Sequence, residues 1–375
     1  MNFEEYAAKR DVLGPAGVPI PKGIVCKSPQ DVSDAIAKIG PGVIKAQVPS
    51  GKRGKAGGIK FATTPEQGAT ESAKIFGMSI AGYEVKQVLV EQACEIAREF
   101  YAAVLIDVAS RSPVVLFSIE GGMDIEEVAE KDPKAIRRHV VDVKHGFGKQ
   151  DAQALLKGLD LGASTDKVAN LLAQLYAIFD AKDAELVEIN PLALLKDGNV
   201  VALDCKFVLD DSSAARQSEL AAAASPPKMT ALESKGADAG LKFIQLDGNV
   251  GVLANGAGLT MTTMDVIDHF GGRPANFLEI GGEAYTKSEI ALDLVLSNPG
   301  VKSLVINFCG AFARTDVMAD GVVKAWQKLK PKVPVFFSIH GTGSDEAVKL
   351  VRNELGFEPY DLMEDAVKAA VEAAR

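Results

Sequence analysis

The sequence contains no long uninterrupted run of apolar residues, and its N-terminus has no apolar segment of the kind that directs secretion. A membrane-spanning helix needs roughly 18 or more consecutive apolar residues, and a secretion signal needs an apolar core. We therefore expect a cytoplasmic protein that neither spans a membrane nor is exported.

Cysteine and histidine are scarce, with four of each in 375 residues. The cysteines are widely separated, and no C-x-x-C pair or Cys/His ligand spacing is present, so neither a zinc site nor a disulfide framework is predicted. No histidine stands in a recognisable arrangement with a nucleophilic serine or cysteine. We expect all four histidines to be packing or surface residues.

Positive charge is also in deficit, because 50 acidic residues outnumber 41 basic ones and the net charge is −9. This balance argues against general nucleic-acid binding, so a local basic cluster should serve a small anionic ligand. The length of 375 residues, with 47% hydrophobic residues, predicts two or three domains.

The most distinctive stretch is residues 45–60, in which a strand runs into a glycine-rich basic loop and leaves as another strand. Glycines let the backbone turn tightly and point bare N–H groups at an anion, and cations add charge. The loop supplies Gly51, Gly54, Gly57 and Gly58, with Lys45, Lys52, Arg53 and Lys55. Ala56 stands where a Walker A loop needs Ser or Thr, so this is not a P-loop. We predict a nucleotide-phosphate clamp; the alternative is a solvated hairpin with a basic tip.

A second candidate site lies in residues 188–206, where Asp197-Gly198 indicates a two-residue hairpin turn. If Lys196 faces Asn199, Asn190 lies opposite Cys205 and one residue from Asp204. An amide and a carboxylate are ligands that magnesium accepts, together with water and nucleotide phosphates. Strict pleating would turn the two side chains to opposite faces, unless Pro191 marks a bulge that restores a common face. The alternative is an ordinary edge hairpin.

The pattern of elements predicts an α/β protein with two domains. We expect a first helix capped by Asn2 and Glu5 in a capping box, and a mixed lobe over residues 20–98 inserted in a domain that spans residues 1–238. Ser28-Pro29 and Thr64-Pro65 each predict a capped helix start, and apolar residues at helical spacing over residues 166–182 predict a helix that packs in the core. The composition shifts to Ala, Ser, Pro and Lys over residues 210–240, which indicates the boundary. Strands that alternate with helices over residues 239–375 predict a doubly wound parallel sheet, with its ligands at the carboxyl ends of the strands.

Several motifs, in the same order along the chain, resemble those of succinyl-CoA synthetase β subunits. They are Met-Asn-x-x-Glu-Tyr-x-Ala-Lys at residues 1–9, Gly-x-Arg-Gly-Lys-Ala-Gly-Gly at 51–58, Glu-Ile-Asn-Pro-Leu at 188–192 and Asn-Gly-Ala-Gly-Leu at 255–259. The resemblance covers essentially the whole chain. It implies an ATP-grasp domain followed by a flavodoxin-like domain.

The resemblance also implies an acid–thiol ligase activity. Members of the family reversibly form an acyl-CoA from a carboxylate such as succinate, CoA, and ATP or GTP, through an acyl phosphate and a phosphohistidine. The phosphohistidine and most of the CoA site belong to a partner α subunit. The other possibilities are a stand-alone ATP-grasp ligase and a regulatory subunit that only binds nucleotide.

Matching positions carry the family's site roles onto this chain. The phosphates would be held by Lys45, Lys52, Arg53 and Gly54, the base and ribose by Glu91, Cys94 and Glu99, and Mg²⁺ by Asn190 and Asp204. Glu188 would steady the phosphohistidine. The carboxylate substrate would meet Asn255, Ala311, Phe312 and Ala313.

The carboxylate site is where this sequence departs most from the family. The turn reads Gly310-Ala311-Phe312-Ala313 in place of Gly-Gly-Ile-Val, Glu283 and Tyr285 stand in a segment that is more glycine-rich in the family, and His340 replaces a glutamate. We predict that succinate is not the preferred substrate and that a hydroxylated or bulkier diacid such as malate is. The alternative is neutral drift with compensating packing.

Overall fold

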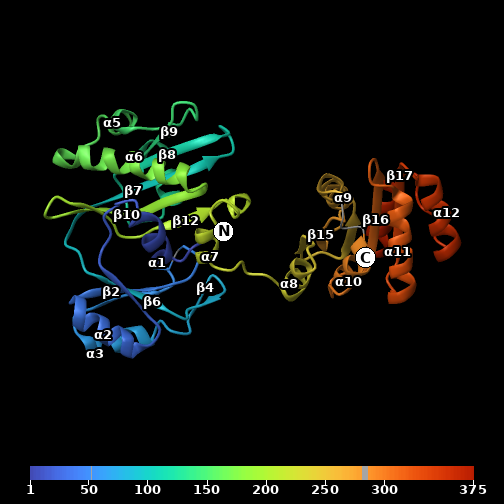
Figure 1. Cartoon of the computed structure of the whole chain (residues 1–375), viewed down its shortest axis with the longest axis horizontal. Helices are drawn as coiled ribbons and strands as arrows, with labels where there is room; N and C mark the ends of the chain where they lie inside the picture. Colours follow the sequence, from blue (N-terminus) through green and yellow to red (C-terminus); the bar gives the residue numbers. More distant parts are fainter. Residues whose placement is uncertain (52, 281–285) are drawn as a thin grey trace. The chain divides into compact units, whose positions relative to one another are not determined.

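The computed structural model describes residues 1–51, 53–280 and 286–375. The chain forms two compact units, Met1–Pro227 and Lys228–Arg375, and each is described by itself (Figure 1). The N-terminal unit contains two sheets, and the C-terminal unit contains a parallel sheet between helices. The predicted boundary after residue 238 falls at the end of α8 (Ala231–Asp238), and the limits of the functional domains stay a prediction.

The larger lobe of the N-terminal unit is built on a six-stranded sheet. The strand order is β11-β10-β7-β8-β9, and β12 also pairs with β10. The strands are β7 (Ile96–Asp107), β8 (Ser112–Ser118), β9 (Ile136–Val140), β10 (Ala184–Leu195), β11 (Val200–Ala202) and β12 (Lys206–Leu209). The helices of this lobe are α1 (Glu5–Ala8), the π-helical turn Lys9–Leu13, α4 (Ile125–Lys131), α5 (Lys149–Leu156), α6 (Thr165–Ala181) and α7 (Ser218–Ala223).

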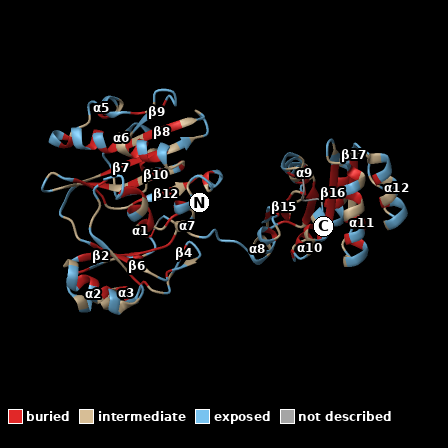
Figure 2. Cartoon of the chain, viewed as in Figure 1, coloured by how far each residue is buried: buried red, intermediate tan, exposed pale blue. Residues whose placement is uncertain are grey.

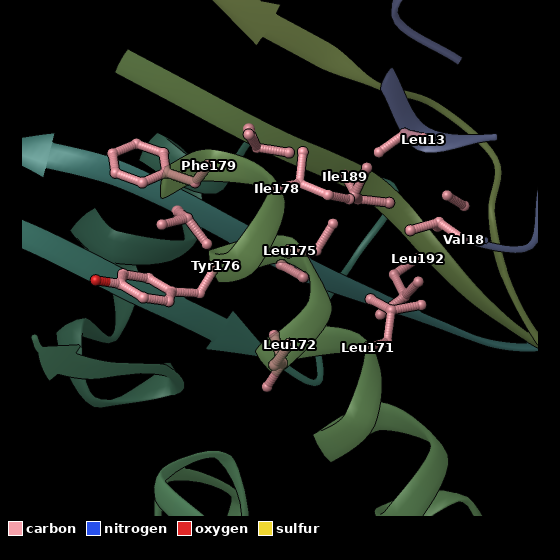
Figure 3. Close-up of a cluster of buried hydrophobic side chains, with 14 of the residues drawn as sticks. Leu13, Val18, Leu171, Leu172, Leu175, Tyr176, Ile178, Phe179, Ile189 and Leu192 are labelled. Atoms are coloured by element: carbon pink, nitrogen blue, oxygen red, sulfur yellow. The ribbon is translucent and has the colours of Figure 1, made fainter. Parts of the chain in front are cut away.

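The long helix α6 carries the apolar stripe that the sequence predicts, and this stripe forms the core of the lobe. Its leucine, isoleucine and aromatic side chains pack toward Ile189 and Leu192 of β10, with Leu13 and Val18 alongside (Figure 3). All of these side chains belong to one buried cluster, so α6 fixes β10 against the N-terminal segment. Burial of this apolar surface is the main force that holds the two elements together.

The smaller lobe is a four-stranded antiparallel sheet in the order β1-β6-β2-β3. Its elements are β1 (Gly23–Cys26), α2 (Pro29–Ile39), β2 (Gly42–Ala46), β3 (Ile59–Ala62), α3 (Pro65–Ala73), the short hairpin β4 (Ser79–Ile80) and β5 (Tyr83–Glu84), and β6 (Val88–Gln92). The hydroxyls of Ser28 and Thr64 accept hydrogen bonds from the third residue of α2 and α3, with Pro29 and Pro65 at the first helical positions. Both predicted caps are confirmed.

The C-terminal unit has a parallel three-stranded sheet, β14 (Val250–Ala254), β16 (Ser303–Gly310) and β17 (Val335–Gly341). A second pair, β13 (Phe243–Gln245) and β15 (Asn276–Leu278), is antiparallel. The helices are α8, α9 (Ala257–His269), α10 (Ser288–Leu296), α11 (Thr315–Leu329), α12 (Ser344–Leu355) and α13 (Met363–Ala373). Separate apolar clusters cover the two faces of the sheet, one with α9 and α13 and the other with α10, α11 and α12.

Burial follows this layered plan in both units. The strands are mostly buried, and the outer faces of the helices are exposed (Figure 2). The predicted doubly wound parallel arrangement of the C-terminal unit is confirmed. Within residues 1–51, 53–280 and 286–375, no helix is both long enough and apolar enough to cross a membrane.

The start of the chain differs from the prediction. The residue before α1 is Glu4, no side chain caps the helix, and the expected capping box of Asn2 and Glu5 does not form. Instead, the Glu5 side chain is fully buried and pairs with Lys9, Lys45 and Arg53. Asn2 pairs with Val208 in an isolated β-bridge.

Candidate functional site

A group of six charged side chains, five of them buried, joins the two lobes of the N-terminal unit. We call it the Glu5 network; it consists of Glu5, Lys9, Lys45, Arg53, Glu91 and Asp204. Three cations balance three carboxylates, and five of the six side chains are at most one-tenth exposed. Buried charges are stable only when they are paired, and this arrangement pairs all of them.

Lys45 reaches two carboxylates at once from β2. Its Nζ lies 2.9 Å from Glu5 Oε1 and 2.6 Å from Glu91 Oε2, and it also donates to the Leu203 carbonyl. Lys9 makes a parallel set, at 2.6 Å from Glu5 Oε1, 2.7 Å from Glu91 Oε1 and 2.8 Å from the Leu203 carbonyl oxygen. The two lysines therefore share both carboxylates and one carbonyl.

Arg53 closes the other end of the network. Its Nη1 lies 2.7 Å from Glu5 Oε2, and its Nη2 donates to Asp204 Oδ1 at 2.5 Å. The glycine-rich loop folds this side chain inward, since the Gly58 N–H donates to the Arg53 carbonyl and Arg53 Nη1 donates to the Ala46 carbonyl. The solvated-hairpin alternative is wrong for Arg53, which is buried. Lys52 lies outside the described residues.

The network sets the protonation of its members. Burial alone would raise the pKa of Glu5, but Lys45, Lys9 and Arg53 hold it well below the ordinary value of 4.5. Burial alone would lower the pKa of Lys45, but Glu5 and Glu91 raise it instead. Glu5 is therefore ionised and Lys45 protonated at neutral pH.

The hairpin that holds the candidate metal ligands has a different register from the predicted one. The loop contains three residues, Lys196, Asp197 and Gly198, and the Leu195 N–H donates to the Asn199 carbonyl. Of Asp197 and Gly198, only Gly198 has a positive φ, of 80°, whereas a two-residue type I′ turn requires both. The extra loop residue shifts the pairing by one.

This shift lets the side chains of Asn190 and Asp204 lie on the same face of the sheet, which the predicted register did not allow without a bulge. The pairs Leu192–Ala202 and Glu188–Lys206 lie two residues to either side of Asn190 and bring it level with Asp204. The two side chains line the same cavity. The pairing of β10 with β7 also shifts between Ile189 and Leu192, so the predicted irregularity at Pro191 is present, but the common face follows from the hairpin register.

Asn190 is held by a loop that crosses β7. Its Oδ1 accepts from the Gly122 N–H at 2.8 Å, and its Nδ2 donates to the Met123 carbonyl at 2.9 Å. Gly122 has a φ of 73°, and a Cβ there would lie 2.0 Å from Glu99 Oε2. A Cβ on Gly121 would lie 2.3 Å from the Phe100 backbone. These two glycines let the loop lie directly against the strand that carries Glu99.

A single cavity of about 650 Å³ collects the candidate residues of this unit. Its lining includes Lys45, Arg53, Gly54, Glu91, Cys94, Glu99, Glu188, Asn190 and Asp204. Apolar side chains, among them Ile59, Phe61 and Ile96, complete the wall. The cavity has the size and mixed lining of a cofactor-sized ligand site. Burial raises the pKa of the Cys94 thiol, so this residue offers the cavity a neutral surface.

Glu188 lies at the strand pairing between β10 and β12. Tyr101 Oη lies 3.5 Å from its Oε2, and Lys206 is its register partner. Burial raises the pKa of Glu188, with Lys206 opposing the shift and Asp204 adding to it. The carboxyl can therefore accept or donate a proton closer to neutrality than an exposed glutamate.

In the C-terminal unit, Asn255 ties two strand ends together. Its Nδ2 donates to the Cys309 carbonyl at 2.8 Å, and its Oδ1 accepts from the Cys309 N–H at 2.7 Å. The following turn exposes Ala311 and Phe312, and Ala313 packs partly against the core. Ala311 does not have a positive φ, so alanine fits this turn without strain. Glu283 and Tyr285 lie outside the described residues.

Comparison with known proteins agrees with this architecture. The ATP-grasp domain family matches residues 2–194, and the CoA-ligase family matches residues 253–371. The chain is 40% identical over 375 residues to the GDP-forming succinate–CoA ligase subunit beta of Thermus thermophilus, a match that covers 99% of this chain and 98% of that protein. It belongs to the succinate–CoA ligase β-subunit family.

Two further matches support the assignment of family and fold. The ADP-forming succinate–CoA ligase subunit beta of Gemmatimonas aurantiaca is 39% identical and covers 100% of this chain and 98% of its own length. The structure of ATP citrate lyase from Methanothrix soehngenii, in complex with citrate and coenzyme A, has a TM-score of 0.75 at 22% identity. It covers 99% of both chains and shows that the fold is shared.

Sequence reasoning missed the part that Glu5 and Lys9 play in the site. Both lie in the N-terminal stretch that resembles the β-subunit family, but their spacing of four on a short helix looks like an ordinary surface pair. Their burial depends on Lys45 and Glu91, which follow 40 or more residues later. Only the placement of both lobes reveals the network.

Proposed function

We propose that this chain is the nucleotide-binding β subunit of a succinate–CoA ligase. The observation that carries the proposal is the convergence of nine candidate residues on one cavity. In the complete enzyme, ATP or GTP drives formation of a CoA thioester from a carboxylate through an acyl phosphate and a phosphohistidine on an α subunit. The α subunit also binds most of the CoA.

The cations of the Glu5 network would hold the nucleotide phosphates. Lys45 and Arg53 are charged and almost dehydrated, and both line the cavity. Gly54 lines the same wall, where its backbone can approach a phosphate without a side chain between them. Lys52 remains part of the proposed clamp. Glu91, Cys94 and Glu99 would meet the base and ribose.

The donor chemistry of Asn190 and Asp204 fits Mg²⁺. Both are hard oxygen ligands, and the hydrogen bonds to Asp204 from Arg53 and Cys205 converge on Oδ1. Within the described residues there is no group of three or more His, Cys, Asp or Glu placed to hold a metal, so nucleotide phosphates and water would complete the shell. Bound Mg²⁺ would neutralise phosphate charge.

Glu188 would receive the partner's phosphohistidine at the edge of the cavity. Its raised pKa suits a carboxyl that exchanges a proton with imidazole, and Lys206 is placed opposite it. None of the described residues that line the cavity is a histidine. The acceptor histidine would therefore come from the α subunit.

Reconstitution with an α subunit of the family tests the proposal. The complex should form acyl-CoA in the presence of Mg²⁺ and ATP or GTP, and the chain alone should show neither ligation nor stable acid-labile labelling from [γ-³²P]ATP. Ligation by the chain alone would indicate a stand-alone ligase. A complex that binds nucleotide without turnover would indicate a regulatory subunit.

The preferred carboxylate is a separate proposal. Phe312 is fully exposed at the carboxyl end of β16, beside Ala311, and Asn255 lies at the end of the neighbouring strand. A side chain of this size would alter the pocket for a diacid, and such pocket changes shift discrimination by about 1–3 kcal/mol. We propose that malate or a bulkier diacid exceeds succinate in kcat/KM. Competition in the reconstituted complex decides this, and the highest kcat/KM for succinate would overturn it.

A further inference from the structure

We infer that Glu5, supported by Lys9, is the positioning residue for the two phosphate-binding cations. This inference rests on the proposed nucleotide site. Among residues 1–51, 53–280 and 286–375, Glu5 is the one carboxylate that contacts both cations, with Oε1 at 2.9 Å from Lys45 Nζ and Oε2 at 2.7 Å from Arg53 Nη1. A single side chain therefore sets the spacing between the two charges.

Glu5 also connects the two lobes of the N-terminal unit. Its helix, α1, belongs to the core of the larger lobe through Phe3, Ala7 and Ala8. Lys45 lies on β2, whose Ile44 and Ala46 belong to the core of the smaller lobe. The contacts of Glu5 thus hold cations of the smaller lobe at a fixed place on the larger lobe, which carries Asn190 and Asp204.

The other two carboxylates of the network, Glu91 and Asp204, would contact the ligand directly in the proposed function. Glu91 would turn to the base and ribose, and Asp204 would bind the metal. Each would then share its charge between its cation and the ligand. Glu5 has no such role, and its fully buried side chain contacts both cations. It is the partner that holds the phosphate cations in place while the nucleotide is bound.

Lys9 keeps Glu5 in position. Its Nζ lies 2.6 Å from the same Oε1 that accepts from Lys45, and it is anchored by the Leu203 carbonyl at 2.8 Å. Two cations on one oxygen leave the carboxylate little freedom to rotate. Preorganised charges bind a ligand more tightly because less ordering is required on binding.

The test compares Glu5→Gln with Glu5→Asp in the full chain. Glu5→Gln keeps the shape but loses the charge, and we expect at least a tenfold rise in the Kd for Mg-ATP by calorimetry, as expected for loss of a hydrogen bond to a charged group. Glu5→Asp keeps the charge on a shorter side chain and should recover part of this loss. In the reconstituted enzyme, the KM for nucleotide should rise more than kcat falls.

Asp11→Asn is the matched control. Asp11 lies on the adjoining helical turn, and its Oδ1 is 2.6 Å from Nε of the exposed Arg10 side chain. The pair lies outside the Glu5 network, so loss of the Asp11 charge should leave the Kd unchanged. Binding is expressed per folded site, which separates affinity from stability. A wild-type Kd for Glu5→Gln overturns the inference, and so does a Glu5→Asp variant no better than Glu5→Gln. Absence of Mg-ATP binding by the wild-type chain would instead overturn the proposed nucleotide site.

Discussion

Both units bury neutral polar side chains, but among the described residues only the N-terminal unit also buries charged ones. Among the described residues, the buried charged side chains are Glu5, Lys9, Lys45, Arg53 and Glu91, and all five belong to the Glu5 network of the N-terminal unit. The buried polar residues of the C-terminal unit are neutral, namely Thr260, Thr263, Asn276, Ser288, Asn298, Ser303, Asn307, Thr315 and Ser338. In the C-terminal unit, neutral side chains hold the elements around the sheet together. In the N-terminal unit, charged side chains lie around the cavity.

The difference distinguishes buried polar side chains that stabilise the fold from buried charged side chains that are placed to bind a ligand. Asn276 exchanges two hydrogen bonds with the Val252 backbone, at 3.1 and 2.8 Å, and is thereby satisfied within its own unit. Lys45 and Arg53 are paired with carboxylates, and the phosphates of a bound nucleotide would become additional partners of both cations. A buried neutral side chain whose hydrogen bonds are satisfied stabilises the folded state. A balanced network of buried charges can also accept a charged ligand as a partner.

The largest effect is expected from removing one cation of the network. Lys9→Met leaves Glu5 and Glu91 with too few partners in a buried place, and this should cost about 3–5 kcal/mol of unfolding free energy. Urea unfolding of the full chain, monitored by hydrogen exchange, would give the stability of each unit separately. The loss should be confined to residues 1–227.

Asn276→Ala is the corresponding measurement in the other unit. Two buried backbone partners lose their hydrogen bonds, which should cost about 1–3 kcal/mol, confined to residues 228–375. Nucleotide affinity should not change. If Lys9→Met reduced the unfolding free energy no more than Asn276→Ala, removing a buried charge would matter no more than removing a buried amide. The contrast between the two units would then be wrong.

Next in size is the loss of nucleotide affinity in Lys45→Ala. The phosphates would lose a charge-assisted contact, so binding of Mg-ATP should weaken by about 1.5–3 kcal/mol in calorimetry. Lys167→Ala supplies a control, because this lysine donates to the Gly198 carbonyl at the far end of the hairpin. Equal affinity of Lys45→Ala and wild type would exclude Lys45 from the phosphate clamp.

The elements of both units could be read from the sequence where a local rule decides them. Ser28-Pro29 and Thr64-Pro65 start helices as expected, because the capping hydroxyl and the backbone N–H that donates to it lie within four residues. The apolar stripe of α6 and the strands near Val250 and Ser303 were found for the same reason. These signals need no information from distant parts of the chain.

The site was harder to predict because it depends on contacts between distant residues. Asp197-Gly198 suggested a two-residue loop, but the conformation of Asp197 adds a residue and moves Asn190 level with Asp204. The first-turn glutamate, Glu5, was assigned to a helix cap and is instead buried beside Lys45. Motif resemblance identified which residues converge on the cavity, and packing determined how they pair.

A smaller effect is expected from mild acid. The folded-state pKa of Glu5 lies well below its ordinary value of 4.5, so its ionised form stabilises the N-terminal unit above that pH. This contribution falls as the pH drops below 4.5 and is lost as the pH passes through the folded-state pKa. Hydrogen exchange corrected for intrinsic rates should show protection falling earlier in residues 1–227 than in the C-terminal unit. Parallel losses would contradict the comparison.

The smallest effect is expected at Lys55, which tests whether every cation of the glycine-rich loop belongs to the network. Its Nζ lies 2.9 Å from Asp124 Oδ2 and 2.7 Å from Glu127 Oε1, and its side chain is 58% exposed. Water and salt screen such pairs, so Lys55→Ala should barely change the melting temperature or the affinity for Mg-ATP. Calorimetry and thermal melts at low and physiological salt would check this. A loss of affinity equal to that of Lys45→Ala would extend the phosphate clamp to the tip of the loop and make burial a poor guide to which cations bind the ligand.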